Sequence, residues 1–319
     1  MSRPTGRRGF LKRTIAASAG AALSLSFEER VLLAKEEKKA PQPARAAEVK
    51  AMPTGKIGNV TVARLICGGN LISGFAHSRD LIYVSPLLRH YFSDDKIMET
   101  LQLCEQNGIN TAILRLDERT RKILNKYWQE RGGKMQWIAQ VKPRERDLTS
   151  DTKDAIDNGA IGVYVQGEVG DRFVANGRVD LLAKSLECIQ ENGVIGGIGA
   201  HALDVIVACE KAGLKPDFYM KTINSKQYWS AGPVPRNDSV WEETPAQTIE
   251  FMKTVDKPWI GFKVLGAGAI EPREGFEYAF ANGADFICVG MFDFQVDEDA
   301  DIARNMLASD IKRARPWRA

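Results

Sequence analysis

From about residue 57 onward, short apolar segments alternate with longer segments whose apolar residues recur every three to four positions. This alternation is typical of parallel strands joined by crossover helices. We count eight such units. The expected strands are VARLICGG (62–69), NTAILRL (110–116), MQWIAQVK (135–142), IGVYVQG (161–167), VIGGIGA (194–200), DFYMKTI (217–223), WIGFKVLG (259–266) and DFICVGM (285–291).

Three expected helices end on Asn-Gly, in EQNG (105–108), QENG (190–193) and FANG (280–283), and a strand follows each of them. Glycine after the last helical residue is the usual left-handed stop. Eight β/α units in about 250 residues predict a (β/α)8 TIM barrel, with a doubly wound open sheet as the second choice. No GxGxxG follows the first strand, which counts against a dinucleotide-binding open sheet.

The first residues differ from this pattern. The basic segment GRRGFLKR (6–13) precedes TIAASAGAALSLS (14–26), an apolar segment too short to span a bilayer. With Arg7 and Arg8, this leader resembles a twin-arginine export signal. We therefore expect residues 1–46 to be signal peptide and linker, residues 47–319 to be one barrel domain, the twin-arginine translocon to be a partner, and the protein to be periplasmic or extracellular.

Charge and cysteine content narrow the class further. The chain has 44 basic and 41 acidic residues, and residues 1–46 hold 10 and 4 of them, which leaves 34 and 37 in the body. A body of net charge −3 argues against nucleic-acid binding. The five cysteines lie in apolar segments without CxxC spacing, which favours buried thiols. Three histidines without HxH or HExxH spacing give no basis for a metal site.

Polar residues cluster where the expected strands end. In a barrel the carboxyl ends of the strands carry the chemistry, so we expect one mouth to collect these side chains. Lysines could instead extend to the rim with packed aliphatic stems. The candidates are Asn70, Arg115, Asp117, Lys142, Gln166, Glu168, His201, Lys221, Asn224 and Lys263.

Two βα loops, 70–95 and 224–245, are much longer than usual and carry aromatic side chains. Aromatic faces beside hydrogen-bonding groups suit a sugar ring, although such loops can also simply pack upon themselves. The expected substrate contacts are His77, Gln166, Asn224, Tyr228 and Trp229.

The chain resembles a divergent aldo/keto reductase over about residues 53–308. The similar segments are GNVTVARLICGGNLISG (58–74), NGINTAIL (107–114), the Val-Lys of the third strand, IGAH (198–201) and GADFICVGMFDFQVDED (283–299). That family reduces carbonyls with a nicotinamide hydride, using a tyrosine, a lysine, an aspartate and a histidine. The resemblance places the lysine on Lys142, the aspartate on Asn110, the tyrosine on Arg115 and the histidine on Gln166, so only the lysine is kept. Arginine cannot replace tyrosine as an acid near neutral pH.

The resemblance also implies a cofactor site. The glycines expected to approach it, with one asparagine, are Gly68, Gly69, Asn70, Gly266, Gly268 and Gly290, although they equally suit tight turns. The acidic segment after the last strand, with Asp293, Asp297, Glu298 and Asp299, would repel the 2′-phosphate of NADP, so any nicotinamide is expected to be NAD(H).

Several functions remain open. The first is an exported aldo/keto reductase-like enzyme acting on a sugar or keto-sugar, with Lys142 and His201 as catalytic groups. The second is a cofactor-independent lyase or epimerase in which Lys142, Lys221 and Lys263 lower one another's pKa and Arg115 holds the oxyanion. The third is a glycoside hydrolase using Glu168 and Glu271. A sugar-binding barrel without catalysis is the last.

Overall fold

Eight parallel strands close into a barrel in the computed structural model, which describes residues 51–75, 81–227 and 242–319. The strands follow the chain order around the barrel, and the last pairs with the first. The prediction of a (β/α)8 barrel is therefore confirmed. Its strands are β3 (Leu65–Gly68), β4 (Thr111–Arg115), β5 (Gln136–Val141), β6 (Gly162–Val165), β7 (Ile195–Ala200), β8 (Phe218–Thr222), β9 (Trp259–Phe262) and β10 (Phe286–Val289).

The first expected strand, 62–69, is wrong in its extent. Its first residues belong to a separate antiparallel hairpin formed by β1 (Thr54–Ile57) and β2 (Val60–Ala63), and only β3 enters the barrel. Arg64 separates β2 from β3 and turns its side chain to the carbonyl oxygens of Asp285 and Ala319. The hairpin was not expected, because β2 and β3 read as one apolar segment.

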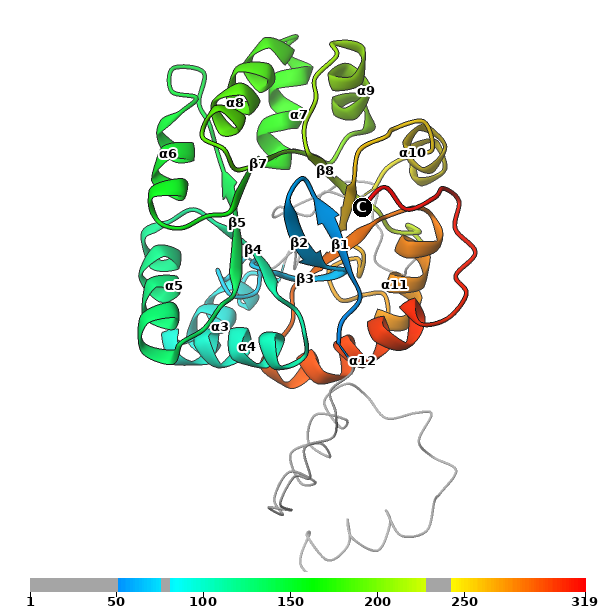
Figure 1. Ribbon diagram of the computed structural model, residues 1–319. Coiled ribbons are helices and arrows are strands. Elements are labelled where there is room, and N and C mark those ends of the chain that lie inside the picture. The colour runs from blue at the N-terminus through cyan, green and yellow to red at the C-terminus, as the bar shows by residue number, and fades with distance from the viewer. Residues whose placement is uncertain (1–50, 76–80, 228–241) are drawn as a thin grey trace, which may run out of the picture. The chain divides into compact units, whose positions relative to one another are not determined.

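Helices surround the barrel (Figure 1). After α4, α8 and α11, the glycines Gly108, Gly193 and Gly283 have φ of +76°, +76° and +108°, which confirms the expected Asn-Gly stops. The helices are α3 (Val84–Tyr91), α4 (Asp94–Gln106), α5 (Glu118–Arg131), α6 (Ser150–Asp157), α7 (Gly167–Ala175), α8 (Val179–Glu191), α9 (Leu203–Lys211), α10 (Pro245–Met252), α11 (Pro272–Ala281) and α12 (Val296–Leu307), with the 3-10 turn η1 (Asp293–Gln295) before the last.

Two helices lie where loops were expected. The long loop 70–95 contains α3, and the chain after β6 enters α7 directly before reaching the expected helix α8. The loop 224–245 lies largely outside the described residues. Because α7 begins immediately beyond β6, it brings a second layer of charged side chains to the end of the barrel where β6 finishes.

The core has an inner and an outer part. Alternate strand residues such as Ile113, Ile138 and Tyr164 fill the barrel, while their neighbours pack against the helices in a larger cluster. Ile57 and Val62 of the hairpin join the inner cluster beside first-of-strand residues such as Phe218 and Phe286. The hairpin therefore closes the amino-terminal end of the barrel.

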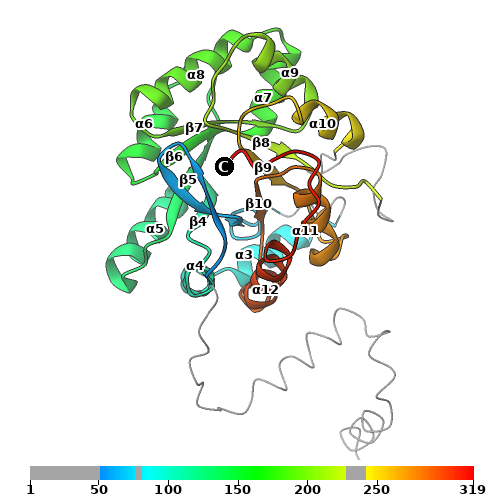
Figure 2. The ribbon, with the colours of Figure 1, turned by 45° about the vertical axis from the view of Figure 1, so that its right-hand side comes forward.

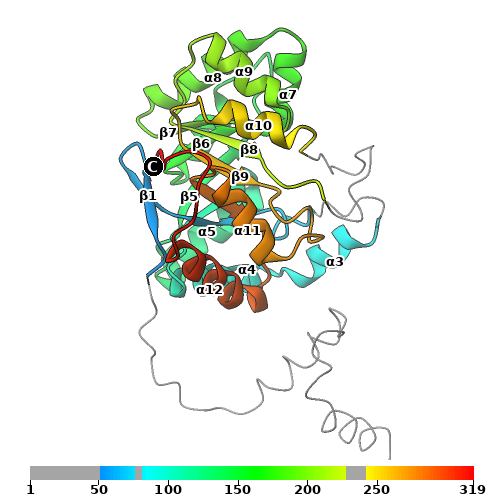
Figure 3. The same cartoon turned by 90° about the vertical axis from the view of Figure 1, so that its right-hand side faces the viewer.

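The two ends of the barrel are distinct in side view. The hairpin and the chain's C-terminus lie at one end, and α3 lies at the other (Figures 2 and 3). The five cysteines are free thiols, four of them buried. Among the described helices, none is both long and apolar enough to cross a membrane. The open end, opposite the hairpin, is where the strand-end residues must be sought.

Candidate active site at the carboxyl ends of the strands

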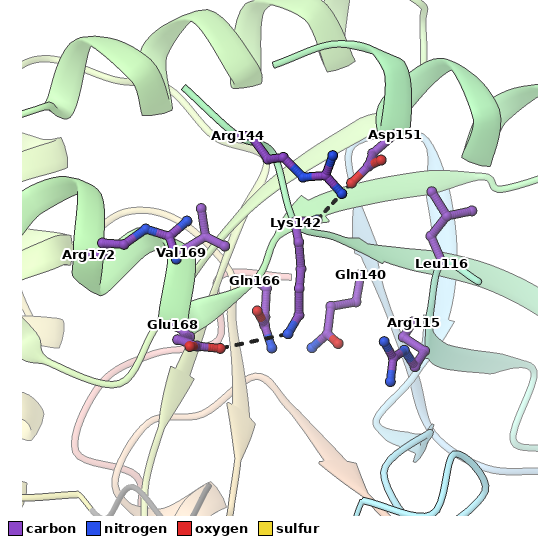
Figure 4. Close-up of a pocket in the computed structure, with 10 residues that line it drawn as sticks. All are labelled: Arg115, Leu116, Gln140, Lys142, Arg144, Asp151, Gln166, Glu168, Val169 and Arg172. Atoms are coloured by element: carbon purple, nitrogen blue, oxygen red, sulfur yellow. Dashed lines mark hydrogen bonds and ion pairs between the residues drawn. The ribbon is translucent and has the colours of Figure 1, made fainter. Parts of the chain in front are cut away.

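A pocket of about 410 Å³ opens where β4, β5 and β6 end (Figure 4). This end of a (β/α)8 barrel is the one that carries active sites. The lining residues are Arg115, Leu116, Gln140, Lys142, Arg144, Asp151, Gln166, Glu168, Val169 and Arg172.

Strand periodicity aims the polar residues into this pocket. Ile113, Ile138 and Tyr164 point into the barrel, and side chains two residues further along a strand point the same way. Arg115, Gln140 and Gln166 are those next positions, and Lys142 follows Gln140 by the same step. The sequence expectation that Lys142 faces the mouth is met by its position in the lining.

Lys142 lies at the centre of the pocket, between Gln140 and Gln166 (Figure 4). Its Nζ is 3.7 Å from Oε2 of Glu168, and the two side chains are 51% and 61% exposed. The backbone N–H of Lys142 donates to Asp151 at 3.3 Å. An accessible ammonium and an accessible carboxylate therefore meet in one pocket.

Arg115 forms one side of the pocket and is held from two directions. Its Nε lies 3.1 Å from Asp117, which also caps α5 by accepting from the Thr120 N–H. Its guanidinium lies over the Phe75 ring, 4.6 Å from the ring centre. A permanently charged group is thus fixed beside Lys142.

The two glutamines differ in their bonding. Gln140 donates from Nε2 to the hydroxyl of Tyr164 at 2.7 Å, and burial raises the pKa of that phenol. Oε1 of Gln166 is buried and has no hydrogen-bond partner among the described residues. A buried acceptor without a donor is costly, so Gln166 is poised to accept a hydroxyl or amide hydrogen from a ligand.

His201 lies in a second polar cluster, outside the lining of this pocket. Nδ1 of its ring is 2.7 Å from Asp171, which also accepts from the backbone N–H of His201 and of Ala202. A carboxylate only accepts, so Nδ1 carries the proton and Nε2 is the acceptor of the neutral ring. Burial lowers the pKa of His201, the hydrogen bond to Asp171 opposes that shift, and the positive charges of Lys263 and Lys221 add to it.

Lys221 does not face the mouth, contrary to expectation. Phe218 and Met220 fill the barrel, so Lys221, one residue further on, points outward between strand and helices. It is 0% exposed and forms a buried ion pair with Glu242. Its Nζ also donates to Thr222 Oγ1 at 2.7 Å, and burial lowers its pKa. The three lysines therefore do not form one cluster.

The remaining expected catalytic residues are dispersed. Lys263 follows β9 with φ of +58° and lies outside the pocket lining. Glu271 immediately precedes α11 and does not line the pocket that holds Glu168. The paired carboxylates of a glycoside hydrolase are therefore not brought together there. Asn224 is buried and bonds to the Lys263 carbonyl and the Lys226 N–H, so it ties β8 to β9.

The counterpart proposed for the reductase aspartate was placed at the wrong end. Asn110 precedes β4, and its side chain bonds to the Ala63 N–H at 2.9 Å and the Thr61 carbonyl at 3.0 Å. Both partners belong to the hairpin that closes the amino-terminal end. Asn110 therefore cannot neutralise Lys142, and Glu168 is the carboxylate that lies near that ammonium.

The expected cofactor glycines have structural explanations. A Cβ on Gly68 would lie 2.9 Å from the Gly290 nitrogen, and one on Gly69 would lie 2.9 Å from the Ile113 carbonyl oxygen. The N–H groups of Gly69, Gly266 and Gly268 already donate to Ile113, Lys263 and Leu265. These three N–H groups are engaged within their turns and are not free to bind a pyrophosphate in this conformation. Asn70 stays at the same turn, where its carbonyl accepts from the Phe75 N–H.

Two acidic side chains of the segment after β10 are already bonded to other residues of the protein. Asp293 bonds to the Tyr91 hydroxyl and to Lys96, at 3.0 Å from its Nζ, and Asp297 accepts from Asn107 at 2.7 Å. These contacts tie η1 and α12 to α3 and α4. The expected substrate contacts His77, Tyr228 and Trp229 lie outside the described residues.

Sequence reasoning missed Gln140, Arg144, Asp151 and Arg172 in the lining. The first two flank Lys142 by two residues, so strand periodicity could have revealed Gln140. Arg172 lies one helical turn after Glu168 on α7 and could be found only once that helix is known.

No protein-family model matches the sequence, and no curated protein matches it. Solved structures do. A putative aldo-keto reductase from Pseudomonas aeruginosa is 16% identical, with 82% of this chain and 98% of that chain covered and a TM-score of 0.55. The holo form of an aldo-keto reductase from Bacillus halodurans is 11% identical, covering 81% and 95%, with a TM-score of 0.56. A glycerol dehydrogenase from Gluconobacter oxydans is 11% identical, covering 82% and 96%, with a TM-score of 0.51. At these identities the similarity shows an aldo-keto reductase-like (β/α)8 barrel and nothing further.

Proposed function

We propose that this protein is an exported enzyme that moves a proton next to the carbonyl group of a sugar, as an epimerase or lyase, in the pocket around Lys142. One observation carries the proposal: the ammonium of Lys142 and the carboxylate of Glu168 meet at 3.7 Å inside a pocket at the carboxyl ends of the strands. Both groups are accessible to a ligand.

The charges suit enolate chemistry. Glu168 accepts the proton from the carbon beside the carbonyl, and the electrons of the broken C–H bond form the enolate double bond. Lys142 and Arg115 stabilise the negative charge that develops on the enolate oxygen. A proton taken up from solvent on the opposite face of that carbon inverts it, whereas expulsion of a hydroxyl group from the next carbon, protonated by the acid form of Glu168 to leave as water, gives elimination.

The glutamines would orient the sugar. Gln166 offers an unpartnered buried oxygen that can accept a hydroxyl hydrogen, and Gln140 is held by Tyr164 beside it. Hydroxyl recognition by fixed amides is typical of small polar ligands in concave sites.

The second candidate is nicotinamide-dependent reduction of a keto-sugar. The likeness to the reductase barrels and to a glycerol dehydrogenase favours it. Against it, no tyrosine lines the described pocket, Arg115 stands where the resemblance implies the tyrosine, and three expected glycine donors are already bonded. We therefore rank proton transfer first and assign no step to a cofactor.

The deciding experiment uses NMR to measure whether deuterium from the solvent replaces the hydrogen on the sugar carbon beside the carbonyl group. A panel of neutral and acidic reducing sugars and keto-sugars is incubated with the mature protein. We expect exchange with the wild type and at least about a 100-fold loss in Lys142→Met and Glu168→Gln, because a positioned acid or base contributes that much. Lys122→Met is the matched control, since Lys122 pairs with Glu118 on the surface of α5.

A parallel titration of tryptophan fluorescence with NADH and NADPH separates the candidates. Saturable binding of NADH without any deuterium exchange would replace the proposal by the reductase reading. Export is tested by fractionating cells that express Arg7→Lys/Arg8→Lys, in which we expect the protein to stay inside the cell.

A further inference from the structure

The pocket has an excess of positive charge that enolate chemistry alone does not use. Four cations line it, Arg115, Lys142, Arg144 and Arg172, against the two carboxylates of Asp151 and Glu168. Residues 47–319 together have a net charge of −3, so this concentration is local. A concave site lined by one sign of charge attracts ligands of the opposite sign.

The inner cations are already paired. Arg115 has Asp117 at 3.1 Å, and Lys142 has Glu168 at 3.7 Å. Asp151 accepts the backbone N–H of Lys142 at 3.3 Å. The other two cations of the lining are Arg144 and Arg172, called the outer pair from here on.

Neither outer guanidinium has an ion pair or a side-chain hydrogen bond among residues 51–75, 81–227 and 242–319. Arginines on the neighbouring helices behave differently. Arg121 pairs with Asp154 at 2.8 Å, and Arg178 binds both carboxylate oxygens of Asp180 at 2.9 Å. Arg144 and Arg172 are therefore two unpaired arginines that line the same pocket.

Local structure places both arginines at the pocket. Arg144 belongs to a tight turn closed by two 2.9 Å backbone hydrogen bonds with Asp147. Arg172 lies one turn after Glu168 on α7, with its guanidinium 5.6 Å from the centre of the buried Phe173 ring. Figure 4 shows Arg144 and Arg172 on different sides of Lys142. The amino end of α7 opens on the same pocket without a side-chain cap, which adds a positive dipole end.

We propose that the substrate is an acidic sugar whose oxyanion, a carboxylate or a phosphate, is bound by Arg144 and Arg172 while its carbonyl lies at Lys142 and Glu168. The assignment rests on the proposed function in taking the ligand to be a sugar. Guanidinium groups match both oxyanions, because their forked N–H donors can bond two oxygens at once.

Isothermal titration at low salt with D-glucuronate, D-glucose 6-phosphate and D-glucose tests this assignment. We expect at least one acidic sugar to bind at least about tenfold more tightly than glucose, and Arg144→Gln and Arg172→Gln each to weaken it about tenfold, as for hydrogen bonds to charged groups. The tighter of the two acidic sugars identifies the carboxylate or the phosphate as the oxyanion.

Arg178→Gln is the matched control, because Arg178 is a nearby exposed arginine that does not line the pocket. Equal binding of acidic and neutral sugars, no binding of either acidic sugar, or the same loss in Arg178→Gln would overturn the assignment. Deuterium exchange on neutral sugars alone would keep the proposed function while overturning this one. Tight acidic-sugar binding without exchange would keep the anion site and overturn the proposed function.

Discussion

The two ends of the barrel use the same kinds of charged residue in opposite ways. At the amino-terminal end, Asp285 is fully buried and pairs with Arg315 at 2.5 Å and Arg313 at 3.5 Å, and it accepts the backbone N–H groups of Trp259 and Arg318. At the mouth, Lys142 and Glu168 are more than half exposed and 3.7 Å apart. The charges are satisfied at one end and available at the other.

The closed end also shows how the C-terminal segment is held. Two guanidiniums lie over the Trp317 ring, with Arg313 3.3 Å and Arg64 4.1 Å from the ring centre. Burial lowers the pKa of Arg313 to about 10. Buried charges that are fully paired are costly to break, whereas exposed pairs contribute little to stability. Charge at the closed end therefore serves the fold, and charge at the mouth is free to serve a ligand.

The largest expected effect comes from Asp285→Ala. Removing this carboxylate leaves Arg313 and Arg315 buried without their partner, so we expect the free energy of unfolding to fall by about 3–5 kcal/mol. Chemical denaturation measures it. Arg172→Gln at the mouth is the comparison, with an expected change within about 0.5 kcal/mol. Similar losses in both variants would contradict the division between the two ends.

Lys221→Met tests whether a buried lysine near the mouth belongs with the structural charges. The substitution leaves the buried Glu242 carboxylate without its ion-pair partner, so we expect the free energy of unfolding to fall by about 3 kcal/mol. The double variant Lys221→Met/Glu242→Leu should recover most of it, because no uncompensated charge remains. In the double variant, the rate of deuterium incorporation into the sugar, per folded molecule of enzyme, should stay near that of the wild type. A loss of exchange as large as in Lys142→Met would return Lys221 to the catalytic residues.

Asp299 differs from Asp285, because it is a buried carboxylate that has no ion pair among the described residues. Burial raises its pKa from 3.8 to about 7, with a smaller contribution from Glu298. Between about pH 4 and 7 the folded state keeps a proton that the unfolded state releases, so stability falls as pH rises through this window. Asp299→Asn should remove this fall and stabilise the protein at pH 8 by up to about 4 kcal/mol, the free energy of a shift of this size. Denaturation at pH 5 and pH 8 checks it, and an equal effect at both values would contradict the shift.

Most of the barrel could be predicted from the sequence because its strands and helices have different hydrophobic periods. All eight expected strands contain a barrel strand, and the Asn-Gly stops fall where predicted. The hairpin was not predicted, because β2 and β3 are both apolar and only Arg64 separates them. Helix α3 escaped because its sequence, VSPLLRHY, contains a proline and follows a long irregular segment.

The site was harder to predict, because position at a strand end does not give side-chain direction. Lys142 and Lys221 both lie at strand ends, yet one enters the mouth and the other packs behind the strand. A single step of the two-residue period separates the two outcomes. The similarity of NGINTAIL (107–114) to the reductases implied that Asn110 replaces their aspartate beside Lys142. The structure places Asn110 at the amino-terminal end of the barrel, opposite the mouth.

Hydrophobic period and turn chemistry along the chain were enough to predict the eight-unit barrel and the Asn-Gly helix stops, because both depend on local sequence. Which charges are paired depends instead on how distant segments pack together in three dimensions. The pairing of Glu168 with Lys142, of Glu242 with Lys221 and of Asp285 with two arginines joins residues 21 to 30 positions apart. Such pairs form only when strand closure and helix packing bring separate segments together, and that closure leaves Arg144 and Arg172 facing the pocket.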